Sequence, residues 1–273
     1  PGSIAQVIAG TDIAMWDLVG KKSGQALWKL FGGSPRIATY ASGLSPTNPE
    51  YLAQQKWDEG HRAFKLKVGF GEDRDFKNLE SLRNLFGNDI KIMVDANQAW
   101  RPDDAAKFIT HLSSLNPYWV EEPLPADSSL LEWKTLAKDI APIQMAAGEN
   151  MRGFKQFNEA IDSGAFGVIQ PDLGKWGGFS GCIPVARSIM RNQLVFCPHW
   201  LGGGIGLIAS MHLKAAVGGP GFVEVDSNPN PLRELLAHPL PKVINGEVCL
   251  SDQAGLGIDP DLPNLRPFLI NLN

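Results

Sequence analysis

Short apolar runs recur along the chain, and polar or glycine-containing stretches separate them. Their β-branched and aromatic content predicts strands, and their centres lie roughly 22 to 29 residues apart, the length of one strand–helix unit. The eight predicted strands are residues 37–42, 63–68, 91–96, 119–122, 143–147, 167–171, 194–198 and 222–225.

Segments with helix signals lie between the predicted strands. NPEYLAQQKWDEG, residues 48–60, has Pro49 in its first turn and Gly60 at its end. RPDDAAKFITHLSSL, residues 101–115, has Pro102 and two acids in its first turn, where the helix dipole favours negative charge. Alternating strands and helices predict an α/β fold with a parallel sheet, and eight units favour a closed barrel over an open doubly wound sheet.

Composition narrows the class of protein. Hydrophobic residues make up 44% of the 273 residues, which suits a globular protein with a core. A net charge of −4 argues against a nucleic-acid surface, and no run of like charge suggests a membrane-binding face. The three cysteines form no CxxC pair, so neither a thiolate zinc site nor a disulfide framework is indicated. We expect a cytoplasmic protein that binds neither nucleic acid nor membranes.

Seven consecutive predicted strands carry or end in a charged or titratable side chain. In a TIM barrel these carboxyl ends converge on one mouth, where active sites lie. A single Asp after a strand is more often a turn former, and paired lysines on a strand often belong to an exposed edge. The joint occurrence favours a functional mouth. The residues are Lys65 and Lys67, Asp95 and Asn97, Glu121 and Glu122, Glu149, Asp172, His199, and Glu224 and Asp226.

Three of these residues predict a metal site. Asp95, Glu121 and Glu149 are spaced by about one strand–helix unit each, so they should lie side by side on adjacent strands. Three adjacent carboxylates repel one another unless a cation lies among them. Oxygen-only ligands select a hard ion, and Mg²⁺ commonly keeps positions open for water or substrate. We therefore predict one Mg²⁺ ion.

At this point the chain resembles the enolase superfamily, specifically its mandelate racemase subgroup, also called the mandelate racemase/muconate lactonizing enzyme family. The resemblance covers nearly the whole chain. It implies a TIM-type barrel of the (β/α)7β kind with remnants of an α+β capping domain. The matching segments are AGTDIAMWDLVGKKSGQALWKLFGG at 9–33, KLK at 65–67, VDAN at 94–97, VEEP at 120–123, GEN at 148–150, PDLGKWGG at 171–178, PHW at 198–200 and VEVD at 223–226.

The resemblance also implies roles for individual residues. Asp95, Glu121 and Glu149 become the Mg²⁺ ligands. Lys67 becomes one acid/base, and His199, supported by Asp172, becomes the other on the opposite face of the substrate. Lys65 and Glu224 become partners of the substrate carboxylate and its enolate, with Glu224 donating a hydrogen bond if it is protonated, and Asn97 contacts a substrate hydroxyl. Lys175, later in the PDLGKWGG motif, is expected to be structural.

The implied reaction is Mg²⁺-dependent abstraction of the proton α to a carboxylate, a pattern known for enolase-superfamily sites with a Lys or His base. We expect dehydration of an aldonate or aldarate to a 2-keto-3-deoxy acid, a lyase reaction, with racemisation or epimerisation of a 2-hydroxy acid as the alternative. The substrate is then a small carboxylate. Rival readings are a Schiff-base aldolase with Lys67 as nucleophile, a phosphate-binding barrel using LGGGIG at 201–206, and a non-catalytic scaffold.

The resemblance divides the chain into three parts. Residues 1–36 are expected to be a lead-in helix from the capping domain, residues 37–231 the (β/α)7β catalytic barrel, and residues 232–273 a segment that completes the cap. We expect the N-terminal part of the capping domain, whose mobile loops close over the mouth, to precede Pro1. A homo-oligomer is also expected.

Overall fold

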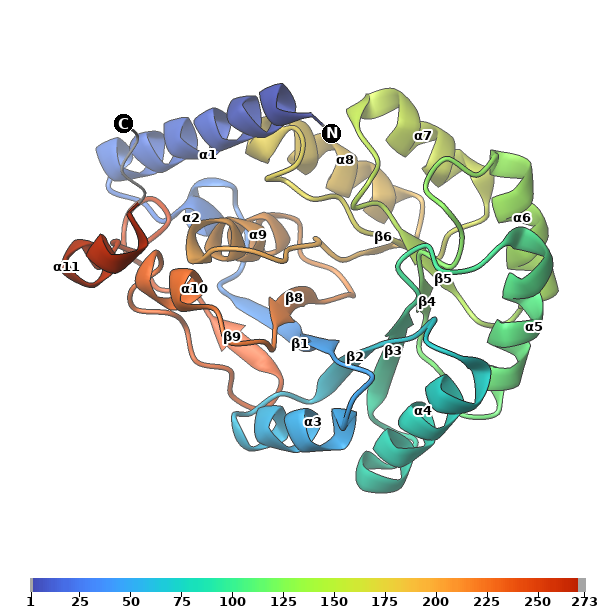
Figure 1. Ribbon diagram of the computed structural model, residues 1–273. Coiled ribbons are helices and arrows are strands. Elements are labelled where there is room, and N and C mark those ends of the chain that lie inside the picture. Colours follow the sequence, from blue (N-terminus) through green and yellow to red (C-terminus); the bar gives the residue numbers. More distant parts are fainter. Residues whose placement is uncertain (1, 270–273) are drawn as a thin grey trace.

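The computed structural model describes residues 2–269 and places parallel strands inside a ring of helices (Figure 1). All eight predicted strands are present, and a ninth follows them. The strands are β1 Arg36–Leu44, β2 Ala63–Lys67, β3 Lys91–Asp95, β4 Val120–Glu121, β5 Met145–Ala147, β6 Val168–Ile169, β7 Val195–Phe196, β8 Val223–Asp226 and β9 Glu247–Cys249.

The helices alternate with these strands, as the sequence pattern predicts. Local signals explain several of them: Pro102 begins one helix, and Ser129 caps another by exchanging hydrogen bonds with Glu132. The helices are α1 Ser3–Ser23, α2 Leu27–Leu30, α3 Pro49–Asp58, α4 Glu72–Phe86, α5 Pro102–Ser113, α6 Leu130–Asp139, α7 Gly153–Ser163, α8 Gly178–Arg191, α9 Gly204–Val217, α10 Pro231–Leu235, α11 Leu262–Leu265 and the 3₁₀ turn η1 Arg266–Phe268.

The sheet runs in the order β7-β6-β5-β4-β3-β2-β1-β8, with all of these neighbours parallel. Within residues 2–269, α3 to α9 each connect two successive strands from β1 to β8, which is the (β/α)7β arrangement. In the same range no ladder joins β7 to β8. Side chains bridge this seam: the Phe222 N–H donates to Cys197 Sγ at 3.3 Å, and Lys214 Nζ donates to the carbonyls of Phe196 and Pro220 at 3.0 and 2.7 Å.

The barrel interior is filled by one layer of side chains, one from each of seven successive strands or strand ends. Because side chains alternate along a strand, the next inward position on β2 above Ala63 is Lys65. The mouth therefore lies directly on a packed floor. The layer consists of Tyr40, Ala63, Met93, Trp119, Ala146, Val168 and Cys197, with Phe222 packed against it.

Segments from both ends of the chain pack on the outside of the barrel. Helix α1 lies along α8, where Trp16 Nε1 donates to Ser180 Oγ at 2.9 Å (Figure 1). Strand β9 pairs antiparallel with β1, and the Leu27 N–H donates to the Gly255 carbonyl at 2.9 Å. The division at residues 36 and 231 stays a prediction. In the part of the chain that the structure describes, no helix combines the length and the apolar character that crossing a membrane requires.

Candidate active site at the mouth of the barrel

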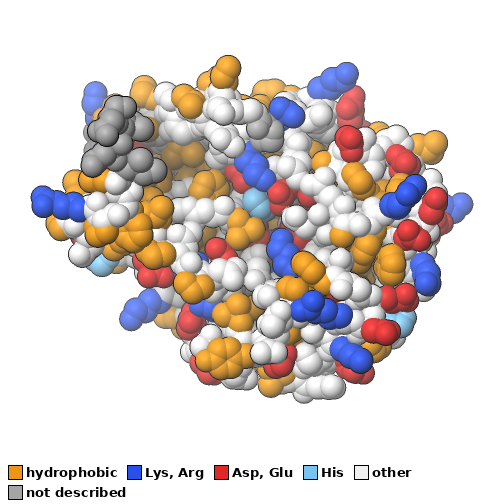
Figure 2. All heavy atoms as spheres, viewed as in Figure 1, with side chains coloured by type: hydrophobic (Ala, Val, Ile, Leu, Met, Phe, Trp, Pro, Cys, Tyr) orange, Lys and Arg blue, Asp and Glu red, His pale blue; other side chains and the backbone are white. Residues whose placement is uncertain are grey.

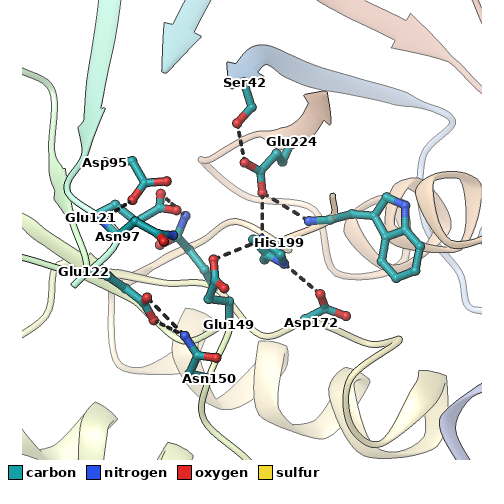
Figure 3. Close-up of polar contacts among 12 residues, drawn as sticks. Ser42, Asp95, Asn97, Glu121, Glu122, Glu149, Asn150, Asp172, His199 and Glu224 are labelled. Atoms are coloured by element: carbon teal, nitrogen blue, oxygen red, sulfur yellow. Dashed lines mark hydrogen bonds and ion pairs between the residues drawn. The ribbon is translucent and has the colours of Figure 1, made fainter. Parts of the chain in front are cut away.

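Charged side chains gather at the carboxyl ends of the strands. Figure 2 shows a hollow at the centre of this face in which acidic and basic side chains surround a histidine. Figure 3 shows Asp95, Glu121, Glu149, Asp172, His199 and Glu224 directed toward one another from separate strand ends. The structure therefore brings together residues that lie far apart in the sequence.

Strands β2, β3 and β4 bring their last residues into line. Lys67 pairs with Asp95, and Asp95 pairs with Glu121, in the parallel register. Lys67 Nζ lies 2.6 Å from Asp95 Oδ2. Lys65 Nζ contacts Glu121 Oε1 and lies 3.5 Å from Asp95 Oδ2. The predicted adjacency of the first two carboxylates follows from this register.

Glu149 follows β5 and also contacts cationic partners. Its Oε1 lies 2.8 Å from Lys175 Nζ, and its Oε2 lies 3.0 Å from His199 Nε2. Hydrogen bonding to His199 and the charge of Lys175 outweigh burial, so the pKa of Glu149 lies well below its usual value. Each of the three predicted metal ligands thus contacts a lysine.

The donor set suits a hard divalent cation, although within residues 2–269 no three Asp, Glu, His or Cys side chains converge closely enough to hold a metal ion as they stand. Asp95, Glu121 and Glu149 offer only carboxylate oxygens, the ligands that Mg²⁺ prefers. The ammonium groups of Lys65 and Lys67 lie against two of these carboxylates, where positive charge is needed. The Mg²⁺ site stays a prediction, and the three carboxylates are ligands of the kind that this ion prefers.

His199 lies at the opposite side of the mouth, after β7. Its Nδ1 lies 2.7 Å from Asp172 Oδ2, and its Nε2 faces Glu149 and Glu224, with Glu224 Oε2 at 3.6 Å (Figure 3). Asp172 is itself held by the N–H groups of Gly174 and Lys175, both at 2.8 Å from Oδ1. Burial alone lowers the pKa of His199, but its three carboxylate neighbours raise that pKa to about 10.

Lys65 and Glu224 form a buried ion pair with Nζ and Oε1 2.7 Å apart. Burial lowers the pKa of Lys65, but Glu121, Glu224 and Asp95 together raise it well above its ordinary value. Burial raises the pKa of Glu224, but Lys65 and His199 lower it to about 2. Glu224 therefore accepts hydrogen bonds from Lys65 and Ser42 in this structure, and its donation of a hydrogen bond when protonated stays a prediction.

Asn97 lies just beyond β3 and is exposed. Its backbone N–H donates to Asp95 Oδ1 at 2.9 Å, and its φ of 46° places it in the left-handed region that Asn tolerates. The predicted contact with a substrate hydroxyl stays a prediction. The neighbouring Glu122 is turned away from this group, where Asn150 Nδ2 donates to both of its oxygens at 2.9 and 3.1 Å (Figure 3).

Sequence reasoning missed several groups that touch the site. Ser42 Oγ donates to Glu224 Oε1 at 2.5 Å, and Gln170 Nε2 donates to Glu121 Oε2 at 2.6 Å. Trp119 Nε1 donates to the same Glu121 oxygen at 3.3 Å. Lys175, expected to be structural, contacts Glu149. Their place at the carboxyl ends of strands could have identified two of these residues. Ser42 ends the first predicted strand, and Gln170 precedes Pro171–Asp172 at the end of the sixth.

These features define a parallel α/β-barrel protein with acid–base groups and carboxylates at the carboxyl ends of its strands. The chain belongs to the Enolase C-terminal domain-like family, whose model matches residues 50–264. The predicted resemblance to the enolase superfamily and its mandelate racemase subgroup is thereby confirmed.

Individual relatives cover most of the chain. The D-galactarolactone cycloisomerase of Agrobacterium fabrum is 30% identical over 96% of this chain and 73% of its own. The arabinonate dehydratase of Saccharolobus solfataricus is 29% identical over 92% of this chain and 68% of its own. These relatives are enzymes that differ in reaction.

Solved structures agree with the fold. A mandelate racemase/muconate lactonizing enzyme from Bordetella bronchiseptica RB50 superposes with a TM-score of 0.94 at 48% identity, covering 98% of this chain and 75% of its own. A racemase from Streptomyces coelicolor A3(2) with bound magnesium superposes with a TM-score of 0.89 at 28% identity, covering 98% and 73%. The TIM-like barrel predicted from the strand repeat is thus confirmed.

Proposed function

We propose that this protein removes the proton α to a carboxylate and dehydrates an acid sugar, an aldonate or aldarate, to a 2-keto-3-deoxy acid. One observation carries the proposal. Lys67 at the end of β2 and His199 after β7 project into one mouth from strands at its two sides, and carboxylates from β3, β4 and β5 lie between them.

Asp95, Glu121 and Glu149 would hold one Mg²⁺ ion. When bound, the ion supplies positive charge that offsets the charge developing on the substrate carboxylate as the α-proton leaves. Lys65 provides a second, fixed positive charge, because it is fully buried against Glu121 and Glu224. The floor of aromatic and apolar side chains excludes water from below, which strengthens these charge interactions.

The two acid/base groups then have separate tasks. Lys67 Nζ accepts the α-proton, and the electrons of the C–H bond move toward the carboxylate to form an enolate. Collapse of the enolate then forms the carbon–carbon double bond as the hydroxyl on the next carbon leaves. His199 Nε2 gives that hydroxyl a proton, so it departs as water. Asp172 holds Nδ1 and so directs Nε2 into the mouth. The enol product becomes the 2-keto-3-deoxy acid.

Two relatives support this reaction class without deciding the substrate. The arabinonate dehydratase is named for a dehydration. A second dehydratase, the L-talarate/galactarate dehydratase of Salmonella typhimurium, is 28% identical over 94% of this chain. The same pair of bases also suits racemisation or epimerisation of a 2-hydroxy acid, since each base can serve one enantiomer. The racemase among the similar structures keeps this second function open.

The test is to incubate the protein with Mg²⁺ and a panel of aldonic and aldaric acids in D₂O, with semicarbazide to trap 2-keto products. We expect keto acid from at least one substrate. His199→Asn should abolish keto-acid formation but leave Lys67 able to exchange an α-proton with solvent. His111→Asn, an exposed histidine on α5, is the matched control and should behave as wild type.

Deuterium in the α-position of unchanged substrate with inversion, and no keto acid from any substrate, would identify a racemase or epimerase. Loss of all activity without a divalent ion, restored by Mg²⁺, is expected under both reactions. Activity that survives chelation and is abolished by borohydride reduction with substrate would point instead to a Schiff base on Lys67.

A further inference from the structure

The glycines of LGGGIG at 201–206 have no role in the proposed reaction. Neither Gly202 nor Gly206 adopts a positive φ, so the backbone does not require glycine at either position. Gly206 lies inside α9, where glycine is less favourable than alanine. A different requirement must therefore favour these glycines, and the space around them supplies it.

The glycines make room for the indole ring of Trp200. A Cβ on Gly206 would lie 2.0 Å from the ring atom Cζ2, and one on Gly202 would lie 3.0 Å from the same atom. A Cβ on Gly174, from the loop after β6, would lie 2.3 Å from Cζ3. The ring Nε1 donates to the Gly203 carbonyl at 2.9 Å. Gly174 after β6, Gly202 after β7 and Gly206 within α9 thus form a socket for one ring.

Trp200 adjoins the chain segments that carry both members of the His199–Asp172 pair. It follows His199 directly. Its ring lies against Gly174, whose N–H donates to Asp172 Oδ1 at 2.8 Å. Its backbone N–H donates to Glu224 Oε2 at 3.1 Å, at the strand on the other side of the seam. One residue therefore contacts the chain segments that carry Asp172, His199 and Glu224.

We infer that Trp200 is a positioning residue that sets the geometry of His199 relative to Asp172 and Glu224. The seam between β7 and β8 lacks a ladder within residues 2–269, so backbone pairing does not align these two strand ends. The ring in its glycine socket and the N–H on Glu224 provide this alignment instead. The LGGGIG segment is accordingly a packing site for an aromatic ring.

The first test reads the His199–Asp172 contact directly and does not depend on activity. The Nδ1–H proton shared with Asp172 should give a low-field proton resonance, assigned by its loss in Asp172→Asn. We expect Trp200→Ala to remove or strongly shift this resonance and Trp200→Phe to restore it, because a smaller ring still fills the socket.

Trp176→Ala is the matched control, since this ring lies on the loop after β6 that carries Asp172 and Gly174 but packs against Phe154 and Phe157. The control should retain the resonance. An unchanged resonance in Trp200→Ala, or equal loss in Trp176→Ala, would overturn the inference.

The second test uses the socket itself. Gly206→Ala should lower the melting temperature when Trp200 is present, because the new Cβ meets the ring. In the Trp200→Ala background the same change should raise the melting temperature, since alanine is the better helix former and the ring is gone. The same sign in both backgrounds would show that Gly206 does not serve Trp200.

A third test rests on the proposed function. Trp200→Ala should lower kcat for keto-acid formation about 10- to 100-fold, the size expected for a misplaced catalytic group. It should leave α-proton exchange by Lys67 nearly unchanged, and Trp200→Phe should recover most of kcat. Equal loss of both activities would contradict a positioning role. If wild type shows neither activity, the proposed function fails, while the resonance and melting experiments still decide the role of Trp200.

Discussion

Two lysines are almost fully buried in this protein, and their surroundings differ completely. Lys65 lies in the mouth, where Nζ contacts Glu121 and lies 2.7 Å from Glu224 and 3.5 Å from Asp95. Lys214 lies at the seam between β7 and β8, where Nζ donates to the carbonyls of Phe196, Gly218 and Pro220 at 2.7 to 3.0 Å. Carboxylates surround the first ammonium group, whereas the second donates to three backbone carbonyls.

The pKa values follow from this difference. Carboxylates raise the pKa of Lys65 well above its ordinary value despite burial. Burial without an adjacent carboxylate lowers the pKa of Lys214 from 10.5 to about 8. Lys65 therefore holds a fixed positive charge in the mouth, whereas Lys214 supplies hydrogen bonds at the seam between β7 and β8.

The largest effect is expected from Lys65→Met. The substitution leaves Glu121 and Glu224 buried without their shared cation, and breaking such a buried pair costs about 3–5 kcal/mol of unfolding free energy. We expect activity to fall by about 10³-fold because a fixed charge beside the reacting carboxylate is lost. Urea unfolding without divalent ions measures the first quantity.

Lys67→Met is the matched control for stability. Its side chain is 23% exposed and contacts a single carboxylate, so its removal should cost at most about 1 kcal/mol. Equal losses of stability in the two variants would contradict the view that Lys65 holds the buried charge cluster together.

Lys214→Met should destabilise the fold by about 1–3 kcal/mol, because three buried carbonyls lose a charged donor. Activity per folded molecule should change little, since Lys214 touches none of the mouth residues. Denaturant unfolding and steady-state kinetics check the two parts. Lys134→Met, an exposed lysine on α6, should leave both quantities unchanged. A large loss of activity in Lys214→Met at full folding would show that the seam controls the site directly.

The pH dependence of stability sharpens the same contrast. Between about 8 and 10.5 the folded protein binds fewer protons at Lys214 than the unfolded chain does. The contribution of Lys214 to the unfolding free energy is therefore fully present above pH 10.5 and is lost as pH falls toward 8. The unfolding free energy falls by at most about 1.4 kcal/mol for each pH unit in this window. The unfolding free energy of wild type should rise relative to Lys214→Met as pH increases through this window. A flat difference would mean that Lys214 keeps an ordinary pKa.

The smallest effect is expected at Ser42, which donates to Glu224 beside Lys65. Ser42→Ala should lower kcat about threefold to tenfold, equivalent to about 1 kcal/mol for a lost hydrogen bond. Ser210 is the matched control, because its buried Oγ finds no hydrogen-bond partner within residues 2–269. Ser210→Ala should not reduce kcat. A larger loss at Ser210 than at Ser42 would refute the assigned role.

The fold was largely readable from the sequence. The eight strands, the alternation with helices and the convergence of polar strand ends depend on local pattern and on the constant spacing of strand–helix units. The adjacency of Asp95 and Glu121 followed for the same reason, because equal spacing places equivalent residues in register. Local periodicity carries this information without any long-range contact.

Other features required the tertiary structure. The contacts of Ser42, Gln170 and Lys175 with site carboxylates join residues 26 to 182 positions apart, so position at a strand end could suggest these residues but not their partners. The lowered pKa of Glu224 likewise depends on Lys65 and His199, which only folding brings near it. The missing β7–β8 ladder, the glycine socket of Trp200 and the role of Lys214 all follow from how the barrel closes. Sequence pattern determines which residues end each strand, but the energy of a buried charge depends on neighbours that three-dimensional packing alone supplies.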